Sequence, residues 1–180
     1  LKELNLPKGS MQLVDNETKA LIAEKSNSLK KSMASGGSAA NTVHGIARLG
    51  TEAAFIGTVG TDEIGKFFSD DLKKSNITPL LNHIDSPSGL ASTLISKDGE
   101  RTFGTFLGAA IELGADNLSD DHFKGYDVLH IEGYLVQNHD LVERALSLAM
   151  NNGLKVSIDL ASYNVVEDNI DFLTEMVIKY

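Results

Sequence analysis

The sequence predicts an α/β protein in which a parallel sheet carries crossover helices and a small β-hairpin stands apart from it. Three observations lead to this prediction. Over residues 126–180, short apolar runs alternate with amphipathic stretches, which is typical of strands joined by crossover helices. The pair Gly36-Gly37 directly precedes an amphipathic helix. Over residues 80–106 the pattern becomes extended, with Asp98-Gly99 at a turn position.

The expected elements follow from apolar spacing and from helix-capping residues. The helix after the glycine pair carries Val43, Ile46, Ala47 and Leu49 on one face. In chain order we expect a short strand over 11–14, a polar helix over 17–31, a helix closed by Gly50, a strand over 53–58, a helix capped by Asp62, hairpin strands over 91–96 and 101–106, a strand over 127–132, a helix over 141–151 closed by Gly153, a strand over 154–160, and a final helix that holds Ile170 to Tyr180.

These elements suggest a division of the chain into a body and a lid. Residues 1–79 and 107–180 form the α/β body, and residues 80–106 form the β-hairpin. The hairpin is a plausible lid over a site in the body. An ordinary edge hairpin is the alternative.

Composition excludes several classes of function. Sixteen Lys and Arg stand against 25 Asp and Glu, a net charge of −9, and the positive charges are scattered. Nucleic acid and anionic membranes are therefore poor partners. The chain has no cysteine, which excludes disulfides and thiolate metal sites and fits a reducing compartment, so we expect a cytoplasmic protein. No apolar run approaches the roughly 20 residues that cross a bilayer.

The stretch 34–41 is the first candidate site. Gly36 and Gly37 allow backbone to approach a ligand closely, and the N–H groups of the first helical turn face the same way. Asn41, one turn further on, can both donate and accept hydrogen bonds. This combination suits a polyhydroxylated ligand better than a bare phosphate. A tight strand-to-helix turn without a ligand is the alternative.

Two carboxylates mark a second candidate site. Glu132 follows the run 128–131 and Asp159 follows the run 156–158, so each lies at the carboxyl end of a predicted parallel strand. Ligands of open parallel sheets bind beyond these ends. Both carboxylates are good acceptors for sugar hydroxyls, although helix capping or solvation explains a single one equally well.

Other site chemistries find little support. The five histidines show no metal-ligand spacing, and we predict no metal ligands; His44 and His130 lie within apolar segments, as expected of core or supporting residues. The chain has neither the Gly-x-Ser-x-Gly of a serine hydrolase nor the Gly-x-Gly-x-x-Gly and Gly-Lys-Ser/Thr of common nucleotide sites.

Taken together, these residues resemble one family. The segment 36–41, followed by Gly50, Gly57, Gly60, Asp62 and Gly65, resembles the first signature of the ribokinase/adenosine kinase (PfkB-type) sugar and nucleoside kinases. Residues 98–102 and 107–110 resemble the family's lid hairpin and its return to the body. The resemblance covers nearly the whole chain. It implies a ribokinase-like three-layer α/β/α parallel sheet with a small β-hairpin lid. Val43 departs from the usual small residue, and because it faces the core we expect altered packing only.

The resemblance also implies a function. The γ-phosphoryl group of ATP, with Mg²⁺ on the nucleotide, would pass to the hydroxymethyl group of a small-molecule sugar or nucleoside. Gly37 and Asn41 would bind ribose-like hydroxyls, Gly36 would permit close approach, Glu132 would be a further acceptor, and Asp159 would support the site indirectly. The lid would exclude water, with Arg101, Phe103 and Phe106 as its candidate residues. The segments 6–9 and 107–110 slightly favour the adenosine kinase side.

The same resemblance indicates what this chain lacks. The family's Gly-Ala-Gly-Asp motif with the catalytic base, its Asn-x-x-Glu motif for Mg²⁺ and its first strand have no counterpart here. We therefore expect a partial chain without the C-terminal ATP-binding half, without a catalytic residue, and inactive alone. Two alternatives stay open: a non-catalytic sugar- or nucleoside-binding module, and a structural domain whose hairpin mediates dimerisation. A homodimer through the lid is a further candidate partner arrangement, because exposed strand edges favour pairing.

Overall fold

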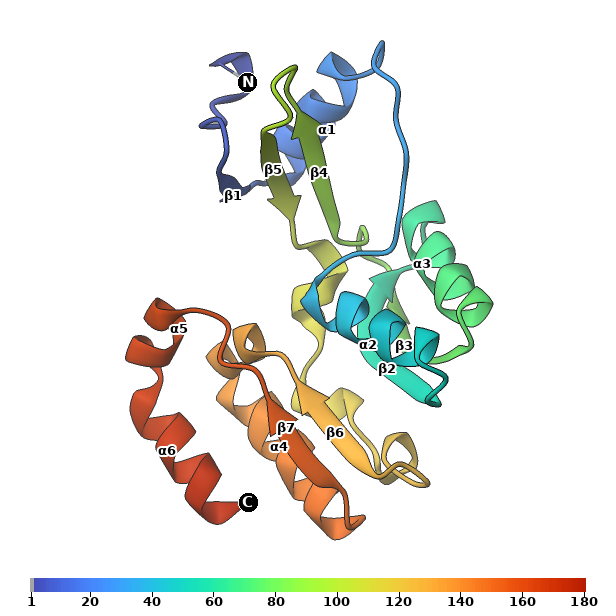
Figure 1. Cartoon of the computed structure of the whole chain (residues 1–180), viewed down its shortest axis with the longest axis vertical. Coiled ribbons are helices and arrows are strands. Elements are labelled where there is room, and N and C mark those ends of the chain that lie inside the picture. Colours follow the sequence, from blue (N-terminus) through green and yellow to red (C-terminus); the bar gives the residue numbers. More distant parts are fainter. Residues whose placement is uncertain (1) are drawn as a thin grey trace. The chain divides into compact units, whose positions relative to one another are not determined.

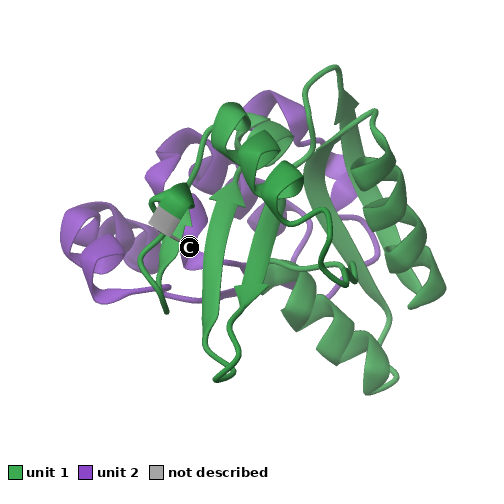
Figure 2. Cartoon of the chain, turned by 90° about the horizontal axis from the view of Figure 1, so that it is seen from above, with its two compact units in different colours: residues 1–112 green, residues 113–180 purple. Residues whose placement is uncertain are grey.

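The structure is a computed structural model that describes residues 2–180 (Figure 1). The chain divides into two compact units, Leu1–Glu112 and Leu113–Tyr180, which Figure 2 shows in different colours. The first unit contains a three-stranded sheet and a two-stranded parallel sheet, and the second contains another two-stranded parallel sheet. Each unit therefore has its own framework, and each is described in turn.

The three-stranded sheet of the first unit has the strand order β1-β5-β4. β4 (Leu90–Ile95) and β5 (Arg101–Phe106) form the antiparallel hairpin that the Asp98-Gly99 turn predicts, with Gly99 at φ 86°. β1 (Met11–Leu13) pairs with β5 in parallel. α1 (Asn16–Lys25) covers one face, where Ile22 is buried and its Cδ1 lies 2.6 Å from where a Cβ on Gly104 would be.

The N-terminal segment is fastened to this hairpin by several bonds. The Gly9 N–H donates to Thr102 Oγ1 at 3.0 Å, and the Phe103 N–H donates to the Ser10 carbonyl at 2.8 Å. Lys8 forms an ion pair with Asp98, and this holds the pKa of the Asp98 carboxyl far below its usual range. The predicted hairpin is thus confirmed, but its third strand, from far earlier in the chain, was not foreseen as a partner.

The two-stranded sheet of the first unit pairs β2 (Ala53–Gly60) with β3 (Ile77–Ile84) in parallel. Helices α2 (Ser38–Arg48) and α3 (Glu63–Lys74) pack against it (Figure 1). Their shared core contains Val43, Leu72 and Ile77, with the rings of Phe55 and Phe68 edge to face at 5.3 Å. The predicted burial of Val43 is confirmed, with 7% of the residue exposed.

Two predicted boundaries differ from the structure. The helix expected over 17–31 ends at Lys25, because serine and asparagine follow it; the Ser26 hydroxyl bonds to the Ala23 carbonyl, which competes with helix propagation. The extended region expected from residue 80 begins with β3, which pairs with β2 along all of its length. The hairpin strands themselves begin at Leu90.

The second unit has the alternation of strand and helix that the sequence predicts. β6 (Val128–Ile131) pairs in parallel with β7 (Lys155–Ile158), and α4 (His139–Asn151) connects them. Asn138 caps α4 by accepting the Leu141 N–H at 3.1 Å. Two further helices follow, α5 (Tyr163–Asp168) and α6 (Ile170–Lys179). Short 3₁₀ segments complete the chain at η1 (Lys2–Leu4), η2 (Gly108–Glu112), η3 (Ala115–Asn117), η4 (Asp120–His122) and η5 (Gly133–Gln137).

The core of the second unit lies between its helices and one face of its sheet. Val136, Val165 and Leu173 form a buried cluster against which Ile158 packs. Along β6 and β7, residues that face outward alternate with residues that face the core. His130 is one of the outward-facing residues. Of the two roles expected for His130, core or supporting, the core role is wrong, because the period of two along β6 turns its side chain away from Leu129 and Ile131.

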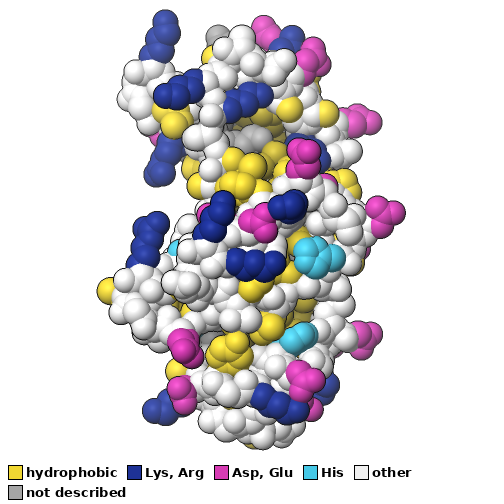
Figure 3. All heavy atoms as spheres, turned by 90° about the vertical axis from the view of Figure 1, so that its right-hand side faces the viewer, with side chains coloured by type: hydrophobic (Ala, Val, Ile, Leu, Met, Phe, Trp, Pro, Cys, Tyr) yellow, Lys and Arg dark blue, Asp and Glu magenta, His cyan; other side chains and the backbone are white. Residues whose placement is uncertain are grey.

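Charges are dispersed over the face of the molecule that Figure 3 shows. On the face in Figure 3, basic and acidic side chains lie interspersed, without one continuous patch of either sign. Within the described residues, no helix is long and apolar enough to cross a membrane.

Candidate functional site

The N-terminus of α2 begins at the glycine pair. Gly37 is the N-cap residue and has φ +97°, a conformation that residues with a side chain rarely adopt. A Cβ on Gly36 or on Gly37 would meet nothing within 4 Å. Gly37 is therefore required by its backbone conformation, and the space beside both glycines is not filled by core side chains.

Asn41 lies in the first turn of α2, off the face that packs into the core. Its N–H donates to the Gly37 carbonyl at 3.0 Å, which joins the two residues in one helical turn. Ala40 and Val43, on the inner face, are buried, whereas Asn41 is exposed. Asn41 is therefore on the solvent-exposed side of α2, one turn after the glycine pair.

Glu132 and Asp159 come together at neighbouring strand ends in the second unit. Ile131 and Ile158 are the last paired residues of β6 and β7, and the Asp159 N–H donates to the Ile131 carbonyl at 2.9 Å. The two acidic residues follow directly. Their predicted placement at adjacent carboxyl ends of parallel strands is what the structure shows.

The two carboxylates have different surroundings. Glu132 is 8% exposed, and its Oε1 lies 3.5 Å from Nε2 of His130. Asp159 is exposed, and its Oδ1 accepts the Ala161 N–H at 2.7 Å within the following loop. Gly133 lets the backbone after Glu132 lie close to the backbone at Asp159, because a Cβ on Gly133 would lie 2.2 Å from the Asp159 carbonyl oxygen. Glu132 is therefore buried, whereas Asp159 is exposed and stabilises the loop that follows it.

The three predicted lid residues occupy different positions on β5. Arg101 is exposed at the start of the strand, with its guanidinium carbon 6.0 Å from the centre of the Phe103 ring. Phe106 ends the strand, and Nζ of Lys19 lies 4.2 Å from the centre of its ring. Phe103 and Phe106 are each partly buried, so both rings contribute to the packing of the three-stranded sheet.

A connection between the body and the hairpin was missed by the sequence analysis. Asp62 caps α3 as expected, with Oδ1 accepting the Gly65 N–H at 2.8 Å. The same carboxylate also accepts the Ser88 hydroxyl at 2.6 Å and the Ser88 N–H at 2.9 Å. Ser88 in turn accepts the Gly60 N–H at 2.8 Å. The dense run Ser86-Pro87-Ser88-Gly89 was the available signal, but it lies 26 residues from Asp62.

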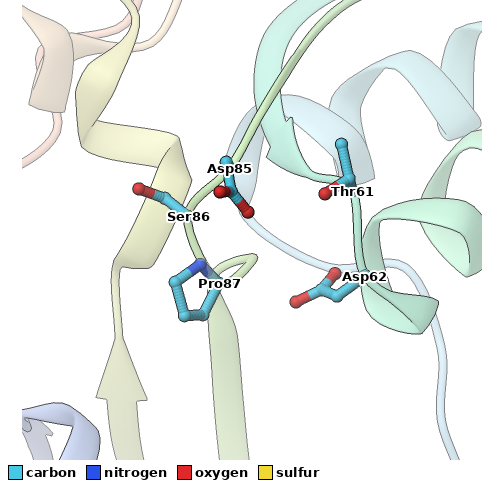
Figure 4. Close-up of a pocket in the computed structure, with 5 residues that line it drawn as sticks. All are labelled: Thr61, Asp62, Asp85, Ser86 and Pro87. Atoms are coloured by element: carbon cyan, nitrogen blue, oxygen red, sulfur yellow. The ribbon is translucent and has the colours of Figure 1, made fainter.

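These bonds govern the charge of Asp62. Burial raises the pKa of its carboxyl, but the hydrogen bonds from Ser88 and Gly65 and the positive charge of Lys19 outweigh burial. The pKa therefore lies below its ordinary value, and the group is ionised at neutral pH. An open hollow of about 370 Å³ adjoins it, lined by Thr61, Asp62, Asp85, Ser86 and Pro87, and Figure 4 shows Asp62 and Asp85 on opposite sides of it.

The candidate residues fall into two groups. Gly36, Gly37 and Asn41 share the first unit with the hairpin residues, and Glu132 and Asp159 share the second. Among the described residues, no cluster of three or more His, Asp or Glu is placed to hold a metal ion.

Comparisons with known proteins extend these observations. The profile of the pfkB family carbohydrate kinases matches residues 9–174. A 5-dehydro-2-deoxygluconokinase from Clostridium perfringens is 30% identical over 141 residues, 72% of this chain and 41% of that protein. A probable fructokinase from Arabidopsis thaliana is 40% identical over 72 residues, 39% of this chain and 21% of that protein.

Solved structures agree in fold. The adenosine kinase from Sinorhizobium meliloti superposes with a TM-score of 0.77 at 30% identity, covering 98% of this chain and 55% of that one. The adenosine kinase from Trypanosoma brucei brucei gives a TM-score of 0.87 at 19% identity, covering 98% and 57%, a likeness of fold alone. The predicted ribokinase-like α/β fold is confirmed. The chain spans about half the length of these solved structures and about two fifths of the gluconokinase.

Proposed function

Since the chain belongs to the pfkB family of carbohydrate kinases, we propose that it provides the acceptor-binding part of an ATP-dependent phosphotransferase. The acceptor group is the hydroxymethyl group of a sugar or nucleoside. The observation that supports this most directly is the start of α2, where Gly36 and Gly37 leave open space beside Asn41. Backbone N–H groups at such a helix start, together with one amide side chain, are suited to binding neutral hydroxyl groups.

We assign the site residues as follows within this proposal. Gly37 and Asn41 hydrogen-bond the hydroxyls of the acceptor, and Gly36 permits its close approach. Glu132 accepts further hydrogen bonds from the hydroxyl groups of the ligand, and its low exposure suits a carboxylate that binds a ligand away from bulk water. Asp159 supports the site indirectly, since its carboxylate already bonds to the Ala161 N–H.

The hairpin β4–β5 acts as a lid in this proposal. Water competes with the acceptor hydroxyl for the phosphoryl group, so closure of a lid favours transfer over hydrolysis. Phosphoryl transfer depends mainly on positioning and on stabilisation of charge. Arg101, Phe103 and Phe106 are the residues of β5 through which we expect the lid to act, and β1 and α1 move with the hairpin because they are bonded or packed to it.

Nucleotide and metal are expected to bind mainly outside the described residues. Kinases of this family use ATP, typically with Mg²⁺. In the part of the chain that the structure describes, no group of three or more His, Asp or Glu is placed to hold a metal ion. The contribution of this chain is to bind and orient the acceptor and to exclude water.

An acceptor screen on the complete gene product tests the proposal. ATP turnover is measured with ribose, fructose, adenosine and 5-dehydro-2-deoxygluconate. We expect turnover with one of them and none with the 180-residue chain alone. Turnover with none of the four contradicts the proposal.

A site variant sharpens this screen. Asn41→Ala should weaken binding of the active acceptor by about 1–3 kcal/mol, because ligand hydroxyls lose their partner. Asn151→Ala, an exposed asparagine at the end of α4, is the matched control and should leave binding unchanged. Equal affinity of the Asn41→Ala variant and the parent would remove α2 from the site.

A further inference from the structure

His130 lies between two polar groups of the second unit. Its Nδ1 is 3.1 Å from Oγ of Ser157, the residue paired with it on β7. Its Nε2 is 3.5 Å from Oε1 of Glu132, two residues further along the chain. His130 thus connects the Ser157 side chain on β7 to the carboxylate at the end of its own strand, β6.

The chemistry of the partners determines how the imidazole is protonated. An ionised carboxylate only accepts hydrogen bonds, so Nε2 must carry a proton to interact favourably with Glu132. When the ring is neutral, Nδ1 then has no proton and accepts the Ser157 hydroxyl. The carboxylate therefore favours the tautomer that points an N–H at it, and the Ser157 hydroxyl stabilises that tautomer by donating to Nδ1.

The distance between Nε2 and Oε1 exceeds the usual range of a hydrogen bond, about 2.7–3.2 Å. A small rotation of either side chain closes it, and hydrogen bonds of functional sites are often long before the ligand binds. Glu132 is 8% exposed, and a polar group removed from water needs hydrogen-bond partners. Asp159, the neighbouring strand-end carboxylate, is likewise held by a donor, the Ala161 N–H.

We propose that His130 is a positioning residue, which donates from Nε2 to the Glu132 carboxylate, accepts the Ser157 hydroxyl at Nδ1, and so orients that carboxylate toward the acceptor. This inference rests on the proposed function, because it gives Glu132 its ligand. It adds a residue that the sequence analysis assigned to the core or to a supporting role without a partner. His130 itself does not touch the acceptor.

Nuclear magnetic resonance tests the tautomer without any assay of activity. Two-bond proton–nitrogen correlation spectra of the protein, recorded at neutral to mildly alkaline pH, should show His130 protonated at Nε2. The Ser157→Ala variant should show a mixture of tautomers, because the donor to Nδ1 is lost. A wild-type ring protonated only at Nδ1 overturns the inference.

Steady-state kinetics test the consequence for the acceptor. The complete gene product is assayed with whichever of ribose, fructose, adenosine and 5-dehydro-2-deoxygluconate it phosphorylates. His130→Ala should raise the KM for that acceptor about tenfold, the loss expected for one hydrogen bond to a charged group, with the KM for ATP unchanged. His130→Gln, which keeps an N–H donor, should restore most of the loss. Lys155→Ala, on the same strand as Ser157 and exposed, is the control and should behave as the parent.

The outcomes separate the inference from the proposed function. If the parent phosphorylates an acceptor and the folded His130→Ala variant keeps its acceptor KM, the inference fails and the function stands. A His130→Gln variant as impaired as His130→Ala also overturns it, since the donor then has no role. If the parent phosphorylates none of the four acceptors, the proposed function fails, and the positioning role fails with it.

Discussion

Replacement of Asp62 by alanine should loosen the connection between the body and the hairpin. The carboxylate accepts three hydrogen bonds, from the Gly65 N–H, the Ser88 N–H and the Ser88 hydroxyl. The first of these caps α3, and the other two fasten the segment that leads into β4. One side chain therefore stabilises a helix start and the root of the hairpin together.

The size of the effect follows from these bonds. Loss of an N-cap costs about 1 kcal/mol, and a hydrogen bond to a charged acceptor contributes about 1.5–3 kcal/mol. Asp62 is partly exposed and its bonds share one carboxylate, so their sum is an upper bound. We expect Asp62→Ala to lower the free energy of unfolding by about 3 kcal/mol. Ser88→Ala should cost about 1–3 kcal/mol, because it leaves the buried Gly60 N–H without its acceptor.

Urea denaturation followed by far-ultraviolet circular dichroism measures the loss, because the chain has no tryptophan to report by fluorescence. Amide exchange at Gly60, Gly65 and Ser88 gives the local readout, and protection should fall at all three in Asp62→Ala. Asp85→Ala is the control, since Asp85 is exposed across the same hollow. A loss below about 0.5 kcal/mol for Asp62→Ala, or unchanged protection at the three amides, would refute this account of the hairpin root.

Three further outcomes are expected. Gly37→Ala should lower the free energy of unfolding by about 1–2 kcal/mol, because a residue with a side chain is strained at φ +97°. Gly36→Ala has open space around the new methyl group and should lower it by about 0.5 kcal/mol or less. Equal losses for the two variants in chemical denaturation would contradict this. The pKa of Asp62 is lowered in the folded state, so the contribution of its charge to stability is complete above the ordinary value of 3.8 and is lost as the pH falls through the folded value. The loss of stability on acidification should therefore be smaller in Asp62→Asn than in the parent. Denaturation curves recorded between about pH 5 and 2 measure this difference. Gly133→Ala should destabilise the second unit by more than about 3 kcal/mol, because its Cβ would lie 2.2 Å from the Asp159 carbonyl oxygen, and a melting temperature within about 2 °C of the parent would speak against that contact.

Much of the fold could be predicted because its signals are local. The glycine pair, the cap at Asp62, the Asp98-Gly99 turn and the closure of α4 at Gly153 each act within a few residues. Burial of Val43 followed from its period along α2. The end of α1 and the pairing of β1 with β5 were not predictable in this way, since serine competition at Ser26 and a partner some 90 residues away decide them.

The candidate site was predictable to the same extent. The adjacency of Glu132 and Asp159 followed from strand order, because neighbouring parallel strands end at the same edge. The contacts of His130 did not follow, since an apolar segment suggested burial while the alternation along β6 turned the ring outward toward Ser157. The second role of Asp62 was hidden because a cap explained the residue already.

The attachment of β1 beside β5 has a mechanical consequence. The backbone crosses between the three-stranded sheet and the β2–β3 sheet at three places: the irregular stretch after α1, the segment 85–89, and the return after Phe106 (Figure 1). A movement of the three-stranded sheet relative to the β2–β3 sheet would therefore have to be accommodated by all three connecting segments together. The first of these segments leads directly into Gly36 and Gly37. Such a movement would therefore displace the backbone at the start of α2.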